Sequence, residues 1–115
     1  MKKDAVVFIQ HIMEAVERIG DYTKHMSKED FISAVQVQDA VIRRIEIIGE
    51  AAKNVPHDFR KKHSSLPWSE MARTRDKLSH GYFGIDLDLT WDIVKNDLPV
   101  LKEKIKKILK ENAKG

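Results

Sequence analysis

The sequence predicts an all-α protein, an antiparallel bundle of four main helices. Apolar residues recur every three to four positions over long stretches, which is the spacing of one face of an α-helix. Residues typical of helix starts, such as Ser27 with Asp30, precede these stretches, and Pro56 is placed to end one of them. The chain shows no internal repeats or low-complexity segments, and we expect a single domain over residues 1–115.

The first two helices are predicted to be long. Residues 3–25 form the first, because an apolar stripe runs along them at helical spacing. The second opens with a capping box at Ser27 and Asp30, with aspartate in place of the usual glutamate, and runs to about Asn54. Pro56 stops it, because proline lacks the N–H that a helix needs. The stripe of the first helix consists of Val6, Ile9, Ile12 or Met13, Val16, and Ile19 or Gly20.

Two further helices follow. Ser65 and Pro67 suit the cap and the first turn of the third helix. Asp86 or Asp88 caps the fourth. Because Pro99 lies inside the fourth helix and cannot donate a backbone hydrogen bond, we expect a bend there. The third helix is expected to end at about Ser79, and the fourth to run from near Leu89 to about Asn112.

The composition is that of a soluble globular protein with one modest core. The chain has 115 residues, of which 42% are hydrophobic and 34% are charged, which excludes disordered and membrane-spanning classes. No apolar run approaches the length of a membrane span, and the N-terminus lacks the pattern of a signal peptide. With no cysteine there is neither a disulfide nor a thiolate nucleophile, so we expect a cytoplasmic protein.

The net charge of +3 is only mildly basic and by itself decides little. Basic residues concentrate in residues 60–63, in residues 73–77 and in the C-terminal run KEKIKKILKENAK. Residues 60–63 are expected in a loop, where charge is common, with phosphate contact as the alternative. The C-terminal lysines are interpreted as the solvated face of an amphipathic helix rather than a nucleic-acid-binding tail.

The reactive groups of the chain concentrate in the run RDKLSHGY, residues 75–82. Arginine suits phosphate oxygens because its planar fork stays charged and donates two parallel hydrogen bonds, while histidine exchanges a proton near neutral pH. Five positions along a straight helix rotate by about 140°, so Arg75 and His80 would not share a face. We therefore expect the helix to end near His80, where Gly81 favours a helix C-terminus. The pair predicts phosphodiester chemistry.

Three segments, in this order, resemble the HepT family of HEPN-domain proteins: IEIIGEAAKNVP, RDKLSHGYFGID and LTWDIVKNDLPVLKEKI. The resemblance covers roughly residues 6–108. The HEPN ribonuclease signature is an arginine, a polar residue, a short spacer and a histidine, and it maps onto Arg75, Asp76 and His80. HepT members add a tyrosine two residues past the histidine, which maps onto Tyr82.

The resemblance implies a HEPN-like helical fold and the toxin of a toxin–antitoxin pair. Such toxins are similar in being metal-independent endoribonucleases without a cofactor, and their antitoxin is a minimal nucleotidyltransferase. That partner can transfer AMP to the motif tyrosine, which makes Tyr82 the expected modification site and would silence the nuclease. From the residues alone, packing would be the simpler role for Tyr82. The alternative function is a non-catalytic subunit that binds the nucleotidyltransferase and presents Tyr82 without cutting RNA.

The resemblance also implies a homodimer, because HEPN nucleases place two motifs at a dimer cleft. The second predicted helix carries a wide apolar face that would suit a second copy of the chain, and Phe31 and Ile42 widen it. The alternative is that the whole face belongs to the core of one chain. The face comprises Val41, Ile45, Ile48, Ala52 and Val55, with Ala40, Ile47 and Ala51 beside them.

A symmetric cleft would supply two histidines to one RNA phosphate. One His80 would take the 2′-hydroxyl proton and the other would protonate the 5′-oxygen, while Arg75 stabilises the phosphate charge. Asp76 could orient Arg75 or His80, or it could be a solvated charge. Glu50 is a cleft candidate through its IGEA context, with a solvated polar face shared with Glu46 as the alternative. No histidine pair or HExxH pattern suits a metal, so we expect no catalytic metal.

Overall fold

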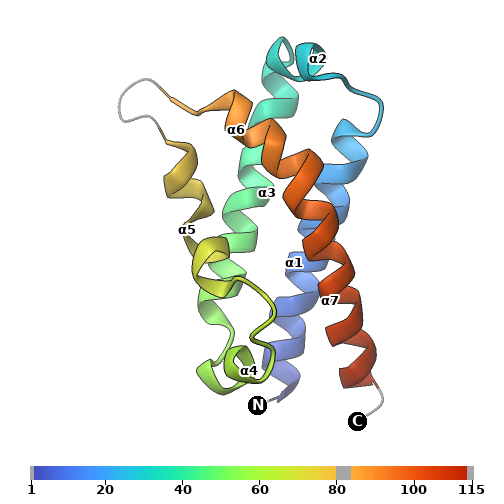
Figure 1. The fold of residues 1–115 in the computed structure, drawn as a ribbon, viewed down its shortest axis with the longest axis vertical. Helices are drawn as coiled ribbons and strands as arrows, with labels where there is room; N and C mark the ends of the chain where they lie inside the picture. The colour runs from blue at the N-terminus through green and yellow to red at the C-terminus, as the bar shows by residue number, and fades with distance from the viewer. Residues whose placement is uncertain (1, 80–83, 114–115) are drawn as a thin grey trace.

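The computed structural model describes residues 2–79 and 84–113 of the chain. Helices make up most of this backbone, so the predicted all-α class is confirmed (Figure 1). Within the described ranges, no helix is both long enough and apolar enough to cross a membrane. The elements are α1 (Lys2–Thr23), α2 (Lys28–Ile32), α3 (Val35–Asn54), α4 (His57–Lys62), α5 (Trp68–Leu78), α6 (Leu87–Asp92), the π-helical segment η2 (Ile93–Asp97) and α7 (Leu98–Ala113).

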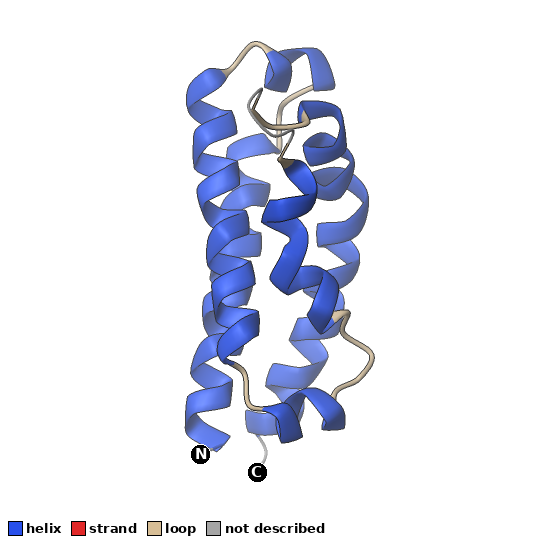
Figure 2. Ribbon diagram, turned by 90° about the vertical axis from the view of Figure 1, so that its left-hand side faces the viewer, coloured by secondary structure: helices blue, strands red, loops and turns tan. Residues whose placement is uncertain are grey.

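Four long helical segments run alternately up and down the molecule, as predicted for an antiparallel bundle (Figures 1 and 2). α3 packs mainly against α1 and α5, and α7 packs against α1. Both termini and α4 lie at one end of the bundle, and α2 lies at the other (Figure 1). Among the most deeply buried core side chains are Ile9, Ile12, Ile19, Phe31, Val41, Ile45, Leu78 and Ile105.

The prediction of one long second helix is wrong, because the structure has two helices there, α2 and α3. The capping box is present: the Asp30 N–H donates to Ser27 Oγ at 3.1 Å, and the Ser27 N–H donates to Asp30 Oδ2 at 3.0 Å. Helix α2 ends at Ile32, where a side chain, and not the backbone N–H groups of a further helical turn, bonds to the last carbonyls. Gln38 Nε2 donates to the carbonyls of both Phe31 and Ile32 at 2.9 Å. A glutamine six or seven residues away thus caps a helix that no proline or glycine ends.

A short helix, α4, occupies the segment that was expected to be a loop. Its first turn buries Phe59, whose ring packs against the imidazole of His63 with centroids 4.5 Å apart. The indole N–H of Trp68 donates to the carbonyls of Arg60 at 3.1 Å and His63 at 3.0 Å. α5 begins at Trp68 with Pro67 at its N-cap, so Ser65 is not the cap that the sequence suggested. Long-range anchoring through Trp68 therefore stabilises a helix too short to form alone.

The last predicted helix exists as α6, η2 and α7 in continuous succession. Asp86 is the cap, because its Oδ1 accepts from the Leu89 N–H at 3.0 Å. The sequence predicts a bend at Pro99; the structure has a π-helical turn just before this residue, where the Leu98 N–H donates to the Ile93 carbonyl five residues back. Proline cannot donate the bond that would continue the α-helical pattern, and the wider turn accommodates that loss.

The apolar face of α3 is mostly core of this one chain. The stripe of Val41, Ile45, Ile48, Ala52 and Val55 is buried, and so is Ala51. Ala40, Ile42 and Ile47 are half-buried. The intramolecular alternative therefore accounts for the stripe, and only the half-buried residues remain on the surface.

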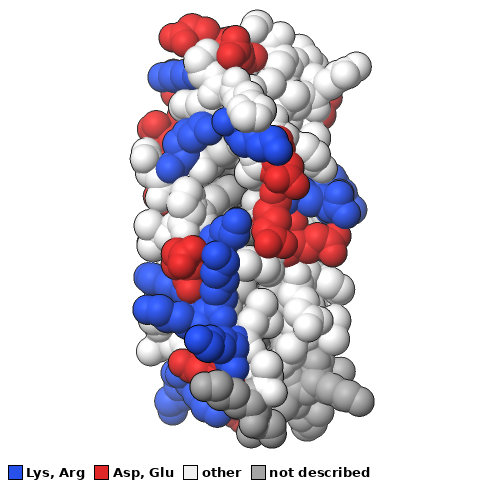
Figure 3. Space-filling model, turned by 90° about the vertical axis from the view of Figure 1, so that its right-hand side faces the viewer, with Lys and Arg blue, Asp and Glu red and all other residues white. Residues whose placement is uncertain are grey.

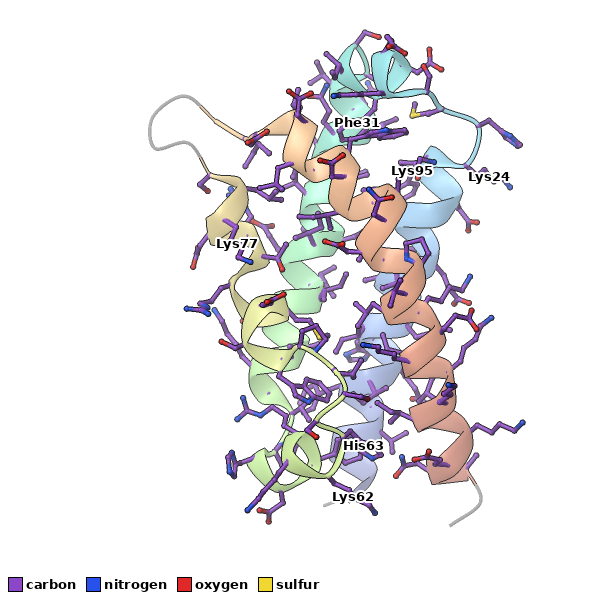
Figure 4. All side chains as sticks on the ribbon, viewed as in Figure 1. Lys24, Phe31, Lys62, His63, Lys77 and Lys95 are labelled. Carbon is purple, nitrogen blue, oxygen red and sulfur yellow. The ribbon has the colours of Figure 1, made fainter. Side chains whose placement is uncertain are left out.

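Phe31 also lies inside the chain rather than on a face for a partner. Its ring is fully buried, and it packs against Trp91 of α6 with centroids 5.3 Å apart. Lys95 Nζ lies 4.6 Å from the centroid of the Trp91 ring and donates to the Thr23 carbonyl at the end of α1 at 3.2 Å (Figure 4). These contacts join α1, α2 and α6 at the upper end of the bundle.

A salt bridge on the surface also links α2 to α6. Lys28 Nζ lies 3.0 Å from Asp88 Oδ1, and both side chains are largely exposed. The hydrogen bond with Asp88 raises the pKa of Lys28. Since surface pairs contribute little, the buried aromatic contact is the stronger link.

Candidate active site

The arginine of the predicted motif lies in the last turn of α5 and is fixed by two side chains. Arg75 Nε donates to Oε2 of Glu46, which lies on the neighbouring helix α3, at 3.1 Å. Arg75 Nη1 donates to Ser79 Oγ at 2.6 Å, one turn further along the chain. The Arg75 side chain is 38% exposed, so the guanidinium is oriented and still accessible. A held, accessible guanidinium is what phosphate recognition requires.

Glu46 is the site residue that the sequence reasoning did not assign. It was interpreted as part of a solvated face with Glu50, yet its carboxylate pairs with Arg75 and also lies 3.7 Å from Arg43 Nη1. The two members of the Arg75 pair are 29 residues apart in the chain. No local signal reports such a pairing, because it depends on how α3 and α5 pack.

Gly49 permits the close packing that brings Glu46 and Arg75 together. A Cβ at this position would lie 3.3 Å from the main-chain oxygens of both Met71 and Ala72. Gly49 is three residues past Glu46, and Ala72 is three residues before Arg75. Because α3 and α5 run in opposite directions (Figure 1), the close contact at Gly49 and the ion pair of Glu46 with Arg75 lie next to each other along the interface of the two helices.

Substitutions at two glycines should therefore have opposite effects. Gly49→Leu should lower the free energy of unfolding by about 1–3 kcal/mol, because the side chain must push α5 away from α3. Gly20→Ala, on α1, should raise it by about 0.5–1 kcal/mol, because nothing lies within 4 Å of a Cβ there. Urea unfolding monitored by circular dichroism measures both. A neutral or stabilising Gly49→Leu would show that α3 and α5 do not need this contact.

His80, Gly81 and Tyr82 lie in residues 80–83, outside the described residues, so their roles stay predictions. The described residues on either side of this segment are joined by backbone hydrogen bonds. Ser79 and Ile85 form an antiparallel bridge, and the Asp86 N–H donates to the Leu78 carbonyl at 2.7 Å. α5 ends at Leu78, close to the helix end predicted near His80.

Gly84 has a backbone conformation that suits glycine. Its φ is +94°, in the region that glycine adopts and L side chains avoid. Ile85, which forms the bridge with Ser79, follows it directly. The two flanks of residues 80–83 are therefore held side by side, next to Arg75.

The other two predicted site residues do not join Arg75. Asp76 and Glu50 are exposed, and neither carboxylate makes a hydrogen bond or ion pair with another described residue. The task of orienting Arg75 falls to Glu46 and Ser79 instead, and a role of Asp76 toward His80 stays a prediction. Over residues 2–79 and 84–113, no group of three or more potential ligands could hold a metal ion.

Residues 12–108 match the family model described as "Ribonuclease HepT-like". The chain belongs to this family. The match spans Arg75 and the run that follows it, so the predicted family and the predicted enzyme class, a ribonuclease, are both confirmed. No solved structure matches the chain.

Archaeal relatives share the HepT-like sequence over nearly all of its length. A protein of Thermococcus cleftensis named "Probable ribonuclease HepT" is 48% identical over 110 residues, covering 96% of this chain and 100% of the relative. A protein of Methanocaldococcus jannaschii named "Gamma-glutamylcyclotransferase and putative RNase" is 53% identical over 111 residues, covering 96% of this chain and 50% of the relative. The chain thus spans half the length of the second protein and the full length of the first.

Proposed function

We propose that the chain is a metal-independent endoribonuclease that acts in the cytoplasm as the toxin of a toxin–antitoxin pair. The observation that carries this proposal is the family match over residues 12–108, which includes Arg75, His80 and Tyr82. The ribonuclease names of the relatives support it. In this proposal the substrate is RNA, and its ribose 2′-hydroxyl is the nucleophile.

The unoccupied hydrogen-bond donors of Arg75 support its proposed role at the phosphate. A guanidinium has five N–H donors. Among the described residues, two are occupied, by Glu46 and Ser79, which leaves three for phosphate oxygens. Glu46 therefore positions Arg75 from one side, and the free edge of the guanidinium can stabilise the negative charge that grows on the phosphate during attack.

The proposed reaction is a transesterification in a homodimer. The His80 of one protomer takes the proton of the 2′-hydroxyl, and the 2′-oxygen attacks the adjacent phosphorus. The bond from phosphorus to the 5′-oxygen breaks, and the His80 of the other protomer donates a proton to that oxygen. The products are a 2′,3′-cyclic phosphate and a 5′-hydroxyl. Each chain brings one motif histidine, so the dimer supplies the pair.

A test of activity compares the native chain with His80→Ala on RNA in the presence of EDTA. We expect cleavage by the native dimer and none by the variant, with both proteins showing the same helical signal and the same mass in solution. Cleavage that EDTA abolishes would contradict the metal-independent reaction. No cleavage by an intact native dimer would favour the alternative, a subunit that binds the nucleotidyltransferase without cutting RNA.

The proposed control of the toxin is transfer of AMP from ATP to the Tyr82 phenol oxygen by a cognate minimal nucleotidyltransferase, with release of pyrophosphate and of the phenol proton. Incubation with that partner and ATP should add the mass of one AMP per native chain and suppress cleavage. Tyr82→Phe should gain no mass and should keep cutting RNA in the same mixture, because it lacks the phenol oxygen. AMP found on another residue, or full activity after modification, would contradict this assignment.

A further inference from the structure

A second concentration of positive charge lies in a groove at the end of the bundle near the termini. It is an open groove of about 660 Å³ between the end of α3, α4 and the first half of α5. Figure 1 shows α4 at the end of the molecule opposite α2, with α5 rising from it along α3. The basic residues that line it are Lys53, Arg60, Lys61 and Arg73.

The charge in this groove is not neutralised by acidic neighbours. None of the described residues that line the groove is an aspartate or a glutamate. Over the described part of the chain, none of its four cationic side chains forms an ion pair with a carboxylate. The whole chain carries a formal charge of +3, so the four charges of the groove leave −1 for everything else. The mild net charge of the protein therefore conceals a strongly cationic site.

One lysine of α7 forms an ion pair, unlike the four basic side chains of the groove. Figure 3 shows the side of the bundle away from α5, where Lys and Arg side chains gather over the lower half with a few acidic side chains beside them. Lys106 pairs with Glu103 at 3.4 Å, and Lys104 Nζ donates to the Ser65 carbonyl at 3.0 Å. These contacts agree with the solvated amphipathic face that the sequence predicts for this helix.

The groove is built on a fixed backbone. Trp68 is only 8% exposed, and its indole N–H holds the carbonyls of Arg60 and His63, which ties α4 to the start of α5.

We propose that this groove binds the sugar–phosphate backbone of the RNA substrate several nucleotides away from the bond that is cut. The inference rests on the proposed ribonuclease function. Arg73 and Arg75 are about 200° apart around α5, so the groove and the motif arginine face different sides of one helix. From Ser69, which lines the groove, to Arg75 the helix axis advances about 9 Å. An RNA strand that contacts Arg75 would therefore pass around α5 to reach the groove.

Binding here should depend on charge and not on base sequence. Lysine and arginine contacts to phosphates release counterions, so each contact to single-stranded RNA steepens the logarithmic salt dependence of the affinity by about 0.7. Lys61 and Arg73 lie on different helices on the two sides of the groove. Loss of both should therefore weaken RNA binding more than loss of two lysines elsewhere.

The test measures RNA binding in the His80→Ala chain, which does not cut, by fluorescence anisotropy with a labelled single-stranded RNA. Lys61→Glu with Arg73→Glu should raise Kd by about tenfold or more and reduce the salt slope by about 1.4. The matched control is Lys24→Glu with Lys107→Glu, which changes the net charge equally outside the groove and should leave the slope unchanged. Circular dichroism checks that both double variants fold. If the Lys61→Glu, Arg73→Glu variant does not fold, the neutral variant Lys61→Gln with Arg73→Gln takes its place.

Two results would overturn the groove as an RNA site. One is native affinity in the folded groove variant, which would leave the groove to another anionic partner such as an acidic protein surface. The other is an equal loss in the matched control, which would mean that only total charge matters. Neither result bears on RNA cutting by the native chain, and an inactive native chain would leave this binding measurement intact. Failure of the groove and failure of the ribonuclease are therefore separate outcomes.

Discussion

Arg75→Ala is expected to lower kcat for RNA cleavage by about 10²–10³-fold, the usual cost of removing one donor that stabilises a developing oxyanion. The loss should appear in kcat more than in KM, because the guanidinium is needed most when charge grows on the phosphate. Arg75→Lys should recover little activity, since an ammonium group cannot reproduce the planar fork held by Glu46 and Ser79. Steady-state cleavage of a labelled RNA by the dimer measures these effects.

The matched control for Arg75 is Arg18→Ala. Arg18 is also a partly exposed arginine paired with a glutamate, at 3.4 Å from Glu14, but it lies on α1. The kcat of the Arg18→Ala variant should equal that of the native chain. If Arg18→Ala loses as much activity as Arg75→Ala, or if Arg75→Ala loses its helical signal, the arginine of the motif is structural and the proposed mechanism is wrong.

Leu78→Ala is expected to lower the free energy of unfolding by about 2–5 kcal/mol, which is a large fraction of the stability of a small domain. Leu78 is fully buried at the last residue of α5, and its carbonyl accepts from the Asp86 N–H. The cavity would open at the end of α5, next to Ser79. Urea denaturation at equilibrium measures the change.

Leu109→Ala on α7 provides the comparison for Leu78. Leu109 is half-buried and packs at the edge of the core, so its truncation should cost clearly less. Equal losses at the two leucines would mean that α5 is not anchored to the core at Leu78 in the way that the structure indicates.

The fold could be predicted where the signals are local. The apolar stripe of α3 is buried as its spacing indicates, and the capping box at Ser27 opens α2 at the predicted residue. The break between α2 and α3 could not be predicted, because it depends on Gln38 reaching back to the carbonyls of Phe31 and Ile32. A local capping box marks where α2 begins, whereas a side chain six or seven residues further along the chain decides where it ends.

The site follows the same division. Arg75 and its place near a helix end could be inferred from residue chemistry and helix geometry. Its partner Glu46 could not be inferred, because the pair forms only when Gly49 lets α3 and α5 meet. The groove also escaped prediction, since Arg60 and Lys61 were expected in a loop and face Arg73 only because Trp68 holds α4 in place.

Identification of the RNA ends left by the native chain in EDTA tests the central claim most directly. The account predicts 2′,3′-cyclic phosphate and 5′-hydroxyl ends, because the 2′-oxygen of the substrate displaces the 5′-oxygen between two His80 side chains. Mass spectrometry of a short cleaved RNA distinguishes these ends from others. Products with 3′-hydroxyl and 5′-phosphate ends would show that water, and not the 2′-hydroxyl, attacks the phosphorus, and would contradict the account.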